Sequence, residues 1–472
     1  MVRTHEIDVT QGNLLKNIIK FALPIIGINI LQILFTTTDT IVLGVFTNDY
    51  AVAGVGATSN IINLLVGFFV AFSTGVNVLI ARCKGSKDQQ KARKAVGSAI
   101  LLSIIGGIVF CVVGVILAED LLIMTKCAPT VLPYATKYLR IYFLGMPIIM
   151  LYNFSAAILR SVGDTFRPLF FLIIAGVVNV GLNIFFVLVV GWDVEGVAIA
   201  TVASKCISAV SSLILIIKND GYAKLERKYF RFNIDELKEI LIIGLPIGIS
   251  KCLFSVANII FQTTLNALGD VAMTAQSVTK EFDGIILEVV HGVGIASLSI
   301  ISQNYGAKKY GRIKKAIFVS IGINLTISLI LGTILIIFGR TLCGIISDTP
   351  EVLELCMVRI TTVSIFYTVL GILNVLQESI RGLGKSFIAT MISIFANIIL
   401  RLIYLFGFYP WLSEGVTLKQ NFALVSFTFP MSWTIATVAS LFILVGIYKK
   451  QVKQLNQNQD FTNEQNADRQ SA

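Results

Sequence analysis

Charged residues are scarce in this chain. They make up 14% of its 472 residues, whereas a typical soluble domain carries about 25%. Hydrophobic residues make up 55% and gather in blocks longer than about 18 residues, which is enough to cross a bilayer as a helix. The composition excludes an ordinary soluble protein and predicts an all-α polytopic membrane protein.

Motifs of metal sites and of enzymes are also missing. The seven cysteines form no C-x-x-C pair or Cys/His cluster, so we predict no metal and no cofactor. Cys343 and Cys356 could pair across an outside loop, a pairing that we do not favour. H-E-x-x-H, G-x-S-x-G, paired GxGD aspartates and a phosphate-binding loop are absent, which argues against an enzyme. No charged ring or filter motif repeats as in a channel.

The net charge of +11 does not indicate a nucleic-acid-binding protein. Basic residues gather in short loops between the apolar blocks, where they orient a membrane protein. The polar segment from Met1 to Lys20 has no small-residue cleavage site, so we predict no signal peptide. The partner implied by this distribution is the lipid bilayer.

Twelve transmembrane helices are predicted from the apolar blocks. They lie near 17–45, 51–81, 95–118, 136–158, 168–190, 194–217, 240–267, 272–302, 316–338, 357–380, 386–409 and 421–447. Loops rich in Lys and Arg, such as Arg82–Lys94 and Lys308–Lys315, alternate with loops that hold few. Because basic loops stay inside, we expect a multi-pass protein of the plasma membrane with both termini in the cytoplasm.

The chain repeats itself at an offset near 221 residues. FALPIIGINI (Phe21–Ile30) resembles IGLPIGISKC (Ile243–Cys252), and ILRSVGDTF (Ile158–Phe166) resembles SIRGLGKSF (Ser379–Phe387). The repeat predicts two six-helix bundles, residues 1–217 and 240–450. An amphipathic cytoplasmic linker (218–239) would join them, and a disordered cytoplasmic tail (451–472) would follow. Such repeats are characteristic of transporters, whose substrate sites lie where the halves meet.

Several motifs follow one another in a specific order. They are Pro24, Gln32 and DTIVLG (Asp39–Gly44), then LRSVGDTFRP (Leu159–Pro168), VVNVGLNIFF (Val177–Phe186) and SQNYGAKK (Ser302–Lys309). With them the chain resembles multidrug and toxic compound extrusion (MATE) transporters over about residues 17–449, closest to the DinF-like branch. The resemblance implies two bundles forming a V. It also implies export of amphipathic, often cationic, small molecules against a proton or sodium gradient, by what we expect to be a monomer.

Asp39 is the most informative single residue, because it stands in the C-terminal half of the apolar run Leu23–Val45. A carboxylate near the centre of a lipid-spanning helix costs roughly 2.5–3.5 kcal/mol on insertion scales. Such a residue usually faces an interior and functions there. Burial disfavours the charged form of a carboxyl group, which suits proton capture on one side and release on the other.

The resemblance implies partners for Asp39 on the fourth to sixth helices. We expect Asp39, Asn179, Asn183 and Tyr138 to couple the proton, with Gln32 and Thr201 lining the same cavity. Other roles remain open. Asparagines often provide interhelical hydrogen bonds in membranes, tyrosines are common at the membrane surface, and Thr201 could bond its own backbone.

Two departures from the family pattern bear on the coupling ion. Asn183 stands where many sodium-coupled members have a second acid, and one carboxylate offers few charged ligands to a hard cation. The glutamate of NorM-like members falls at Phe254. We therefore favour protons over sodium. A sodium-coupled exporter of the same fold remains an alternative, as does a lipid-linked precursor flippase. The flippases usually carry a strongly cationic cavity, and the intramembrane cations here are only Lys205, Lys251 and Arg401.

Charged residues recur in the second half, in the eighth span KEFDGIILEVVH (Lys280–His291). Because charge facing lipid is unfavourable, we expect a set of second-half residues to line the inner face or a water-filled cleft: Lys251, Glu281, Asp283, Glu288, His291 and Arg401. A cation pocket and a merely water-exposed stretch are both compatible with this pattern. We expect Arg401 to neutralise an acid such as Glu378 or Glu288.

Overall fold

The computed structural model describes the backbone of residues 7–471 and the side chains of residues 7–453. The first half contains α1 (Leu14–Phe46), α2 (Asp49–Gly85), α3 (Gln89–Met124), α4 (Leu132–Leu144), α5 (Met146–Ser161), α6 (Phe166–Ile184) and α7 (Val194–Lys218). The second half contains α8 (Ile234–Asn266), α9 (Asp270–Gly306), α10 (Tyr310–Gly344), α11 (Pro350–Val363), α12 (Tyr367–Gly382), α13 (Ser386–Ile394), α14 (Leu400–Ile403), α15 (Tyr409–Leu412), α16 (Leu418–Ser426) and α17 (Thr428–Ser471). Short π-helical segments (Phe185–Val189, Phe395–Ile399 and Tyr404–Phe408) and the 3₁₀ turn Ser364–Phe366 continue these helices.

The predicted spans are confirmed. Within the described residues, eleven helices or continuous helical runs are long and apolar enough to cross a membrane, and α4 with α5, bent by 51°, supplies a twelfth. The bend follows from Pro147, which lacks a backbone N–H and cannot continue α4. Helices begin where the sequence supplies caps, since Asn13, Asn48 and Asp88 each accept a hydrogen bond from the backbone of the following turn.

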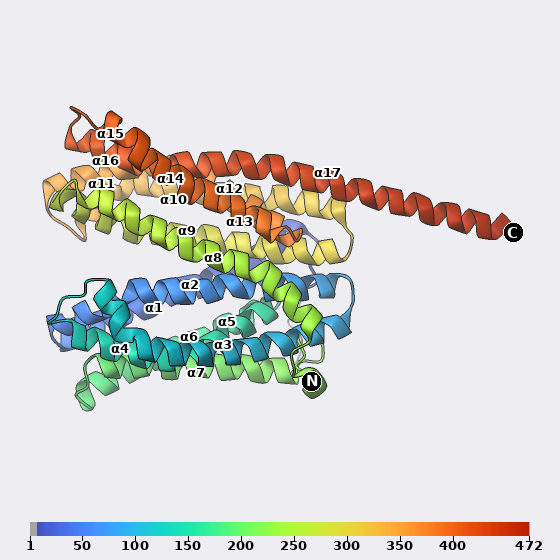
Figure 1. The fold of residues 1–472 in the computed structure, drawn as a ribbon, viewed down its shortest axis with the longest axis horizontal. Helices are drawn as coiled ribbons and strands as arrows, with labels where there is room; N and C mark the ends of the chain where they lie inside the picture. Colours follow the sequence, from blue (N-terminus) through green and yellow to red (C-terminus); the bar gives the residue numbers. More distant parts are fainter. Residues whose placement is uncertain (1–6, 472) are drawn as a thin grey trace.

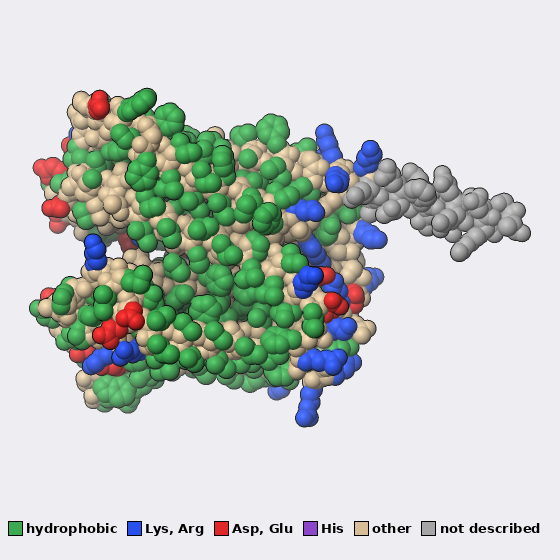
Figure 2. Space-filling model, viewed as in Figure 1, with side chains coloured by type: hydrophobic (Ala, Val, Ile, Leu, Met, Phe, Trp, Pro, Cys, Tyr) green, Lys and Arg blue, Asp and Glu red, His purple; other side chains and the backbone are tan. Residues whose placement is uncertain are grey.

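The helices form two bundles that lie side by side, α1–α7 in one and α8–α17 in the other (Figure 1). α2 packs along α8, and both α1 and α2 pack against α9, so four helices make most of the boundary between the halves. This arrangement confirms the predicted pair of six-helix bundles. The bundles part from each other at the left of the space-filling view (Figure 2).

The outer surface matches a bilayer. On α3 the exposed side chains Ile105, Val109, Val112 and Ile116 follow one helical face, and hydrophobic side chains cover the middle of the molecule (Figure 2). Lys and Arg gather at one end, the end where the labelled chain termini lie (Figures 1 and 2). We call this the basic end. The chain is a multi-pass membrane protein.

At the basic end the two halves touch through a nearly symmetrical set of contacts. Arg82 of α2 donates a hydrogen bond to the carbonyl oxygen of Gly382 at 3.1 Å. Gln303 of α9 donates one to the carbonyl oxygen of Ser161 at 2.7 Å. Gln303 follows Arg82, and Gly382 follows Ser161, by the 221 residues of the repeat. The duplicated sequence therefore produces duplicated contacts.

Glycines allow the close approach of α2 and α9 at this end. A Cβ atom on Gly85 would lie 1.9 Å from the carbonyl oxygen of Gln303, and one on Gly306 would lie 2.1 Å from that of Arg82. Both distances are far below contact distance. The helices can pack this closely only because both positions lack a side chain.

The linker between the halves has little regular structure. Residues 219–233 are mostly irregular, with a single 3₁₀ turn at Arg227–Tyr229. They fold back on α3, where Arg93 pairs with Glu226. The hydrogen bond from Lys228 and the neighbouring Arg93 charge keep the pKa of Glu226 below its usual range. The predicted amphipathic character of the linker stays a prediction.

The predicted disordered tail (451–472) stays a prediction. α17 continues to Ser471, and residue 472 lies outside the described residues. Residues 451–471 contain neither glycine nor proline, so nothing in the sequence ends a helix that the last span has already nucleated.

Candidate functional site

Asp39 lies inside the first bundle with both carboxylate oxygens hydrogen-bonded. The Asn183 amide donates to Oδ1 at 2.8 Å, and the Thr201 hydroxyl donates to Oδ2 at 2.8 Å. Only 1% of Asp39 is exposed. These bonds join α1, α6 and α7 around one buried acid, so the structure brings together three of the residues predicted from the sequence.

Asn179, one turn before Asn183 on α6, completes this cluster. Its amide donates to the Thr201 hydroxyl at 3.2 Å, and its Oδ1 accepts from the Asn183 amide at 3.4 Å. The spacing of four residues places the two asparagines on one face of α6. We call Asp39, Asn179, Asn183 and Thr201 the Asp39 cluster. Each of its side chains is buried.

Asn183 has one atom without a partner in this cluster. Its Oδ1 is buried and accepts no hydrogen bond from any side chain that the structure describes. A buried acceptor without a donor is unfavourable. As long as Asp39 is a carboxylate it can only accept hydrogen bonds, so the acid supplies no donor to that oxygen.

Among the described residues, neither Tyr138 nor Gln32 forms a hydrogen bond with the Asp39 cluster. Tyr138 is 3% exposed, packs with Val42 and Leu43 of α1, and stacks on Tyr142 with ring centroids 6.2 Å apart. Gln32 is half-buried, two turns before Asp39 on α1. Their predicted roles in proton coupling and cavity lining stay predictions.

Lys205 is a neighbour that the predicted site did not include. It lies one turn after Thr201 on α7 and interacts electrostatically with Asp39. Its Nζ lies 4.4 Å from the ring centroid of Phe35, one turn before Asp39 on α1. The spacing of four residues from Thr201 was the available sequence signal, since it puts Lys205 on the same helical face.

The charged residues of the second half do not form one cluster. Lys251 and Glu281 are exposed, whereas Glu288 and His291 are half-buried. Asn29 of α1 donates to the carbonyl oxygen of Glu288 at 3.1 Å, so this turn of α9 lies at the boundary between the halves. Lys251 also lies at this boundary, because a Cβ on Gly67 would meet its side chain at 3.3 Å.

Asp283 lies deeper in the second bundle. It accepts hydrogen bonds from Arg359 of α11 and from the Tyr367 hydroxyl of α12. Arg359 is 3% exposed. Asp283 therefore serves here as the counter-charge of a buried arginine, and neither partner was among the predicted site residues.

The expectation that Arg401 neutralises an acid is wrong. Arg401 is buried, and among the described residues no carboxylate pairs with it. Glu378 instead pairs with Arg381, three residues further along α12. A partner within one turn of the same helix is reached more easily than one on another helix.

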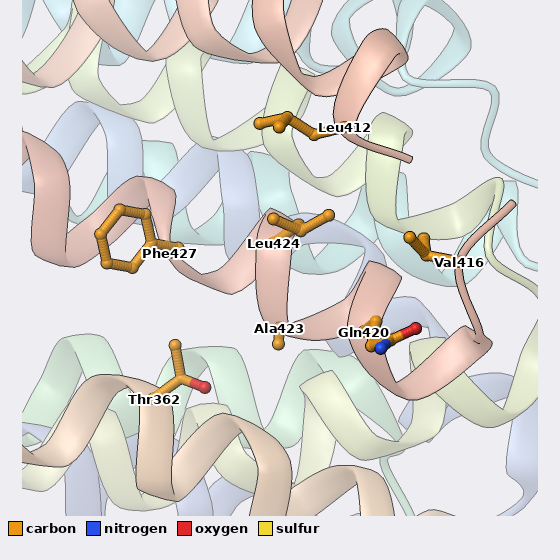
Figure 3. A pocket seen from close by; sticks show the side chains of 7 residues that line it. All are labelled: Thr362, Leu412, Val416, Gln420, Ala423, Leu424 and Phe427. Carbon is orange, nitrogen blue, oxygen red and sulfur yellow. The ribbon is translucent and has the colours of Figure 1, made fainter. Parts of the chain in front are cut away.

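A pocket of about 450 Å³ opens elsewhere in the second bundle, between α11, α15 and α16 (Figure 3). Figure 3 shows its lining as Thr362, Leu412, Val416, Gln420, Ala423, Leu424 and Phe427. It contains no charged side chain and none of the predicted site residues.

Comparison with known proteins agrees with this two-bundle arrangement. The profile of the family MatE matches residues 24–185 and 246–406, once in each half. This chain belongs to the MATE family. It is accordingly a membrane transporter and not an enzyme. Its assignment to the DinF-like branch stays a prediction.

Individual relatives of this MATE protein are distant but match over most of their length. The probable multidrug resistance protein YpnP of Bacillus subtilis (strain 168) is 24% identical over 413 residues, which cover 86% of this chain and 91% of YpnP. The probable multidrug resistance protein YoeA of the same organism is 26% identical over 386 residues, or 80% of this chain and 83% of YoeA.

Solved structures show the same fold. An outward-facing multidrug resistance MATE transporter of the MOP superfamily superposes with a TM-score of 0.86. The superposition covers 95% of this chain and 99% of that one, at 19% identity. It confirms the MATE-like arrangement of the two bundles.

Proposed function

We propose that this transporter exports amphipathic, cationic small molecules from the cell in exchange for protons, with Asp39 as the proton carrier. The observation that carries the proposal is the Asp39 cluster, in which a buried acid meets Asn183 and Thr201. A proton on Asp39 adds a donor to a cluster that holds an unpartnered acceptor, Asn183 Oδ1. The cluster then has a second hydrogen-bonding arrangement available to it.

The helix that carries Asp39 can convert this local change into a larger one. Pro24 lies inside α1, and a proline within a helix removes a backbone hydrogen bond and permits a bend. Protonation removes the charge of Asp39 and alters its bonds to α6 and α7. It thereby biases α1 between a straight and a bent state, which is the two-state element that a switch requires.

The energy of one proton is sufficient for useful export. Moving one charge inward across 100 mV releases about 2.3 kcal/mol. Export of a monovalent cation costs the same amount, so a one-for-one exchange draws on the pH gradient instead. Since about 1.4 kcal/mol corresponds to a factor of ten and to about one pH unit, each unit of pH difference supports a substrate gradient of about tenfold. Protons are favoured over sodium because Asp39 is the one acid of its cluster, and a hard cation prefers several oxygen ligands with negative charge.

The basic end is proposed to face the cytoplasm of a plasma-membrane protein, in accordance with the positive-inside rule. Both termini then lie inside. The parting of the halves at the opposite end (Figure 2) corresponds to a cleft that opens outward. The Asp39 carboxylate supports a cationic substrate, and the names of YpnP and YoeA support export of several compounds. We expect the monomer to be the functional unit.

Proteoliposomes test this proposal. Purified protein is reconstituted, and ethidium transport is followed under an imposed proton gradient or an imposed sodium gradient. We expect transport with the proton gradient alone, and its loss in Asp39→Asn, which mimics the protonated acid. Asp49→Asn is the matched control, because Asp49 is exposed at the start of α2. Undiminished proton-driven transport by Asp39→Asn would contradict the proposal, as would transport driven by sodium alone.

A further inference from the structure

Arg401 of α14 is a buried cation, and two of its nitrogen atoms lack a hydrogen-bond partner among the described residues. Only 2% of the residue is exposed. Its Nε donates to the Ser432 hydroxyl at 3.1 Å. Nη1 and Nη2 are buried and have no hydrogen-bond partner among the described residues. An arginine stays protonated in proteins, so this side chain carries a full charge without a counter-charge.

Aromatic rings cover the guanidinium group of Arg401 on two sides. Its Cζ lies 4.5 Å from the ring centroid of Phe429 and 5.4 Å from that of Phe254. Cation–π contacts stabilise a buried cation only in part, and burial of an unpaired charge costs more than they return. The rings also leave the donors Nη1 and Nη2 unsatisfied.

Two other arginines of the second bundle have carboxylate partners. Arg359 lies 5.2 Å from the ring centroid of Phe429 and pairs with Asp283, and Glu378 pairs with Arg381. Arg401 differs from these two arginines, because no carboxylate that the structure describes balances its charge. A single negative charge would balance it.

We propose that Arg401 is the centre of a binding site for one monovalent anion, either a halide ion or the carboxylate group of a small molecule. Nη1 and Nη2 would donate to the anion. The guanidinium group carries one positive charge, which one negative charge neutralises. A monovalent anion therefore fits this site better than a phosphate dianion.

The position of Phe254 gives this site an entrance. The centroid of this half-buried ring lies 5.4 Å from Arg401 Cζ and 6.0 Å from Lys251 Nζ. Lys251 is exposed at the boundary between the halves. Its positive charge attracts anions from the cleft, and a rotation of Phe254 admits them to Arg401. The site does not depend on the proton coupling proposed for Asp39.

Trp433 provides a reporter for this site. Its ring centroid lies 5.8 Å from that of Phe429, which contacts Arg401, and the residue is 7% exposed. The chain has three tryptophans, so Trp192→Phe with Trp411→Phe leaves Trp433 as the single indole. Iodide quenches indole fluorescence on contact. The full-length protein in detergent is titrated with iodide at constant ionic strength.

We expect quenching that saturates, with an apparent affinity at least tenfold weaker in Arg401→Gln. Arg340 is an exposed arginine of α10, and Arg340→Gln should leave the apparent affinity for iodide unchanged. Displacement of iodide by acetate identifies a site that takes carboxylates, and displacement by bromide alone identifies a halide site. Either result supports the proposal.

A second measurement uses the unaltered protein and does not depend on the folding of Arg401→Gln. Crystals soaked in bromide should show an anomalous peak beside Arg401 Nη1 and Nη2. The proposal is overturned if quenching rises linearly without saturation in the single-tryptophan protein that keeps Arg401. It is equally overturned if Arg401→Gln saturates at the same iodide concentration, or if the bromide peak is absent.

Discussion

Gln303 donates a hydrogen bond from Nε2 to the carbonyl oxygen of Ser161 at 2.7 Å, and so ties α9 of the second half to α5 of the first. Gln303 is fully buried. Arg82 makes the corresponding bond in the opposite direction, to Gly382. If the cleft is to open at the basic end, both bonds must break. These residues therefore act as a latch, which we define as Arg82, Ser161, Gln303 and Gly382.

The close packing of α2 and α9 at the latch gives a first prediction. Gly306→Val places a side chain 2.1 Å from the carbonyl oxygen of Arg82, so the halves should separate there. A destabilisation of the closed state by about 1.4 kcal/mol raises the open population about tenfold. The change is measured as faster maleimide labelling of a thiol introduced by Ser299→Cys, in a background without the seven native cysteines.

Ser299 suits this measurement because it is fully buried and donates to Asn77 Oδ1 across the boundary at 3.0 Å. Gly322→Val is the control, because a Cβ at Gly322 meets no atom within 4 Å. Equal labelling rates in the Gly306 and Gly322 variants would show that the latch does not hold the halves together.

A second prediction concerns the buried pair of Asp283 and Arg359. Asp283→Asn removes the counter-charge of Arg359, which is 3% exposed. Breaking a buried pair in this way costs about 3–5 kcal/mol. Thermal unfolding in detergent, followed by circular dichroism, should show a clearly lower midpoint.

The exposed pair of Glu354 and Lys419 is the matched control. Both side chains are at least half exposed, and a surface pair contributes up to about 1 kcal/mol, so Glu354→Gln should hardly change the midpoint. The double variant Asp283→Leu with Arg359→Met should recover much of the stability, because it leaves no buried charge unpaired. A loss from Asp283→Asn no larger than that from Glu354→Gln would contradict this account.

The sequence was sufficient for the fold and for the core of the Asp39 cluster. A long apolar segment in lipid must satisfy its own backbone hydrogen bonds, and it does so as a helix. The 221-residue repeat also predicted how the twelve helices divide between the two bundles. Asp39, Asn179, Asn183 and Thr201 were predicted together, and the structure joins them by hydrogen bonds.

The partners in the second half could not be predicted in the same way. Asp283 and Arg359 are 76 residues apart, and sequence patterns relate only neighbours within a turn or two. The assignment of Arg401 to an acid failed for this reason, because the nearer Arg381 already holds Glu378.

A third prediction concerns Thr201, whose hydroxyl donates to Asp39 Oδ2 at 2.8 Å. Thr201→Val keeps the shape of the side chain but removes a hydrogen bond to the charged form of the acid. Asp39 should then take up a proton more readily. The pH midpoint of proton-driven transport should rise by up to about one unit, which corresponds to about 1.36 kcal/mol.

Thr40→Val is the control for this shift. Thr40 follows Asp39 on α1, is exposed, and donates to the carbonyl oxygen of Thr36 within its own helix. Its replacement should leave the midpoint where it is. A midpoint that falls in Thr201→Val, or that moves equally in both variants, would argue against the Asp39 cluster as the titrating site.

The last prediction concerns the coupling ion. In the structure the amide nitrogen of Asn183 lies 2.8 Å from Asp39 Oδ1. Asn183→Asp therefore puts a second carboxyl group next to Asp39. Two carboxylates with the Thr201 hydroxyl and Asn179 Oδ1 offer a hard cation several oxygen ligands. We expect the variant to bind ²²Na⁺ and to transport ethidium under a sodium gradient, whereas the unaltered protein does neither. Asn60→Asp, at an exposed position of α2, should behave like the unaltered protein. Sodium binding by the unaltered protein that Asp39→Asn abolishes would mean that Asp39 already serves a sodium site and that proton coupling is wrong.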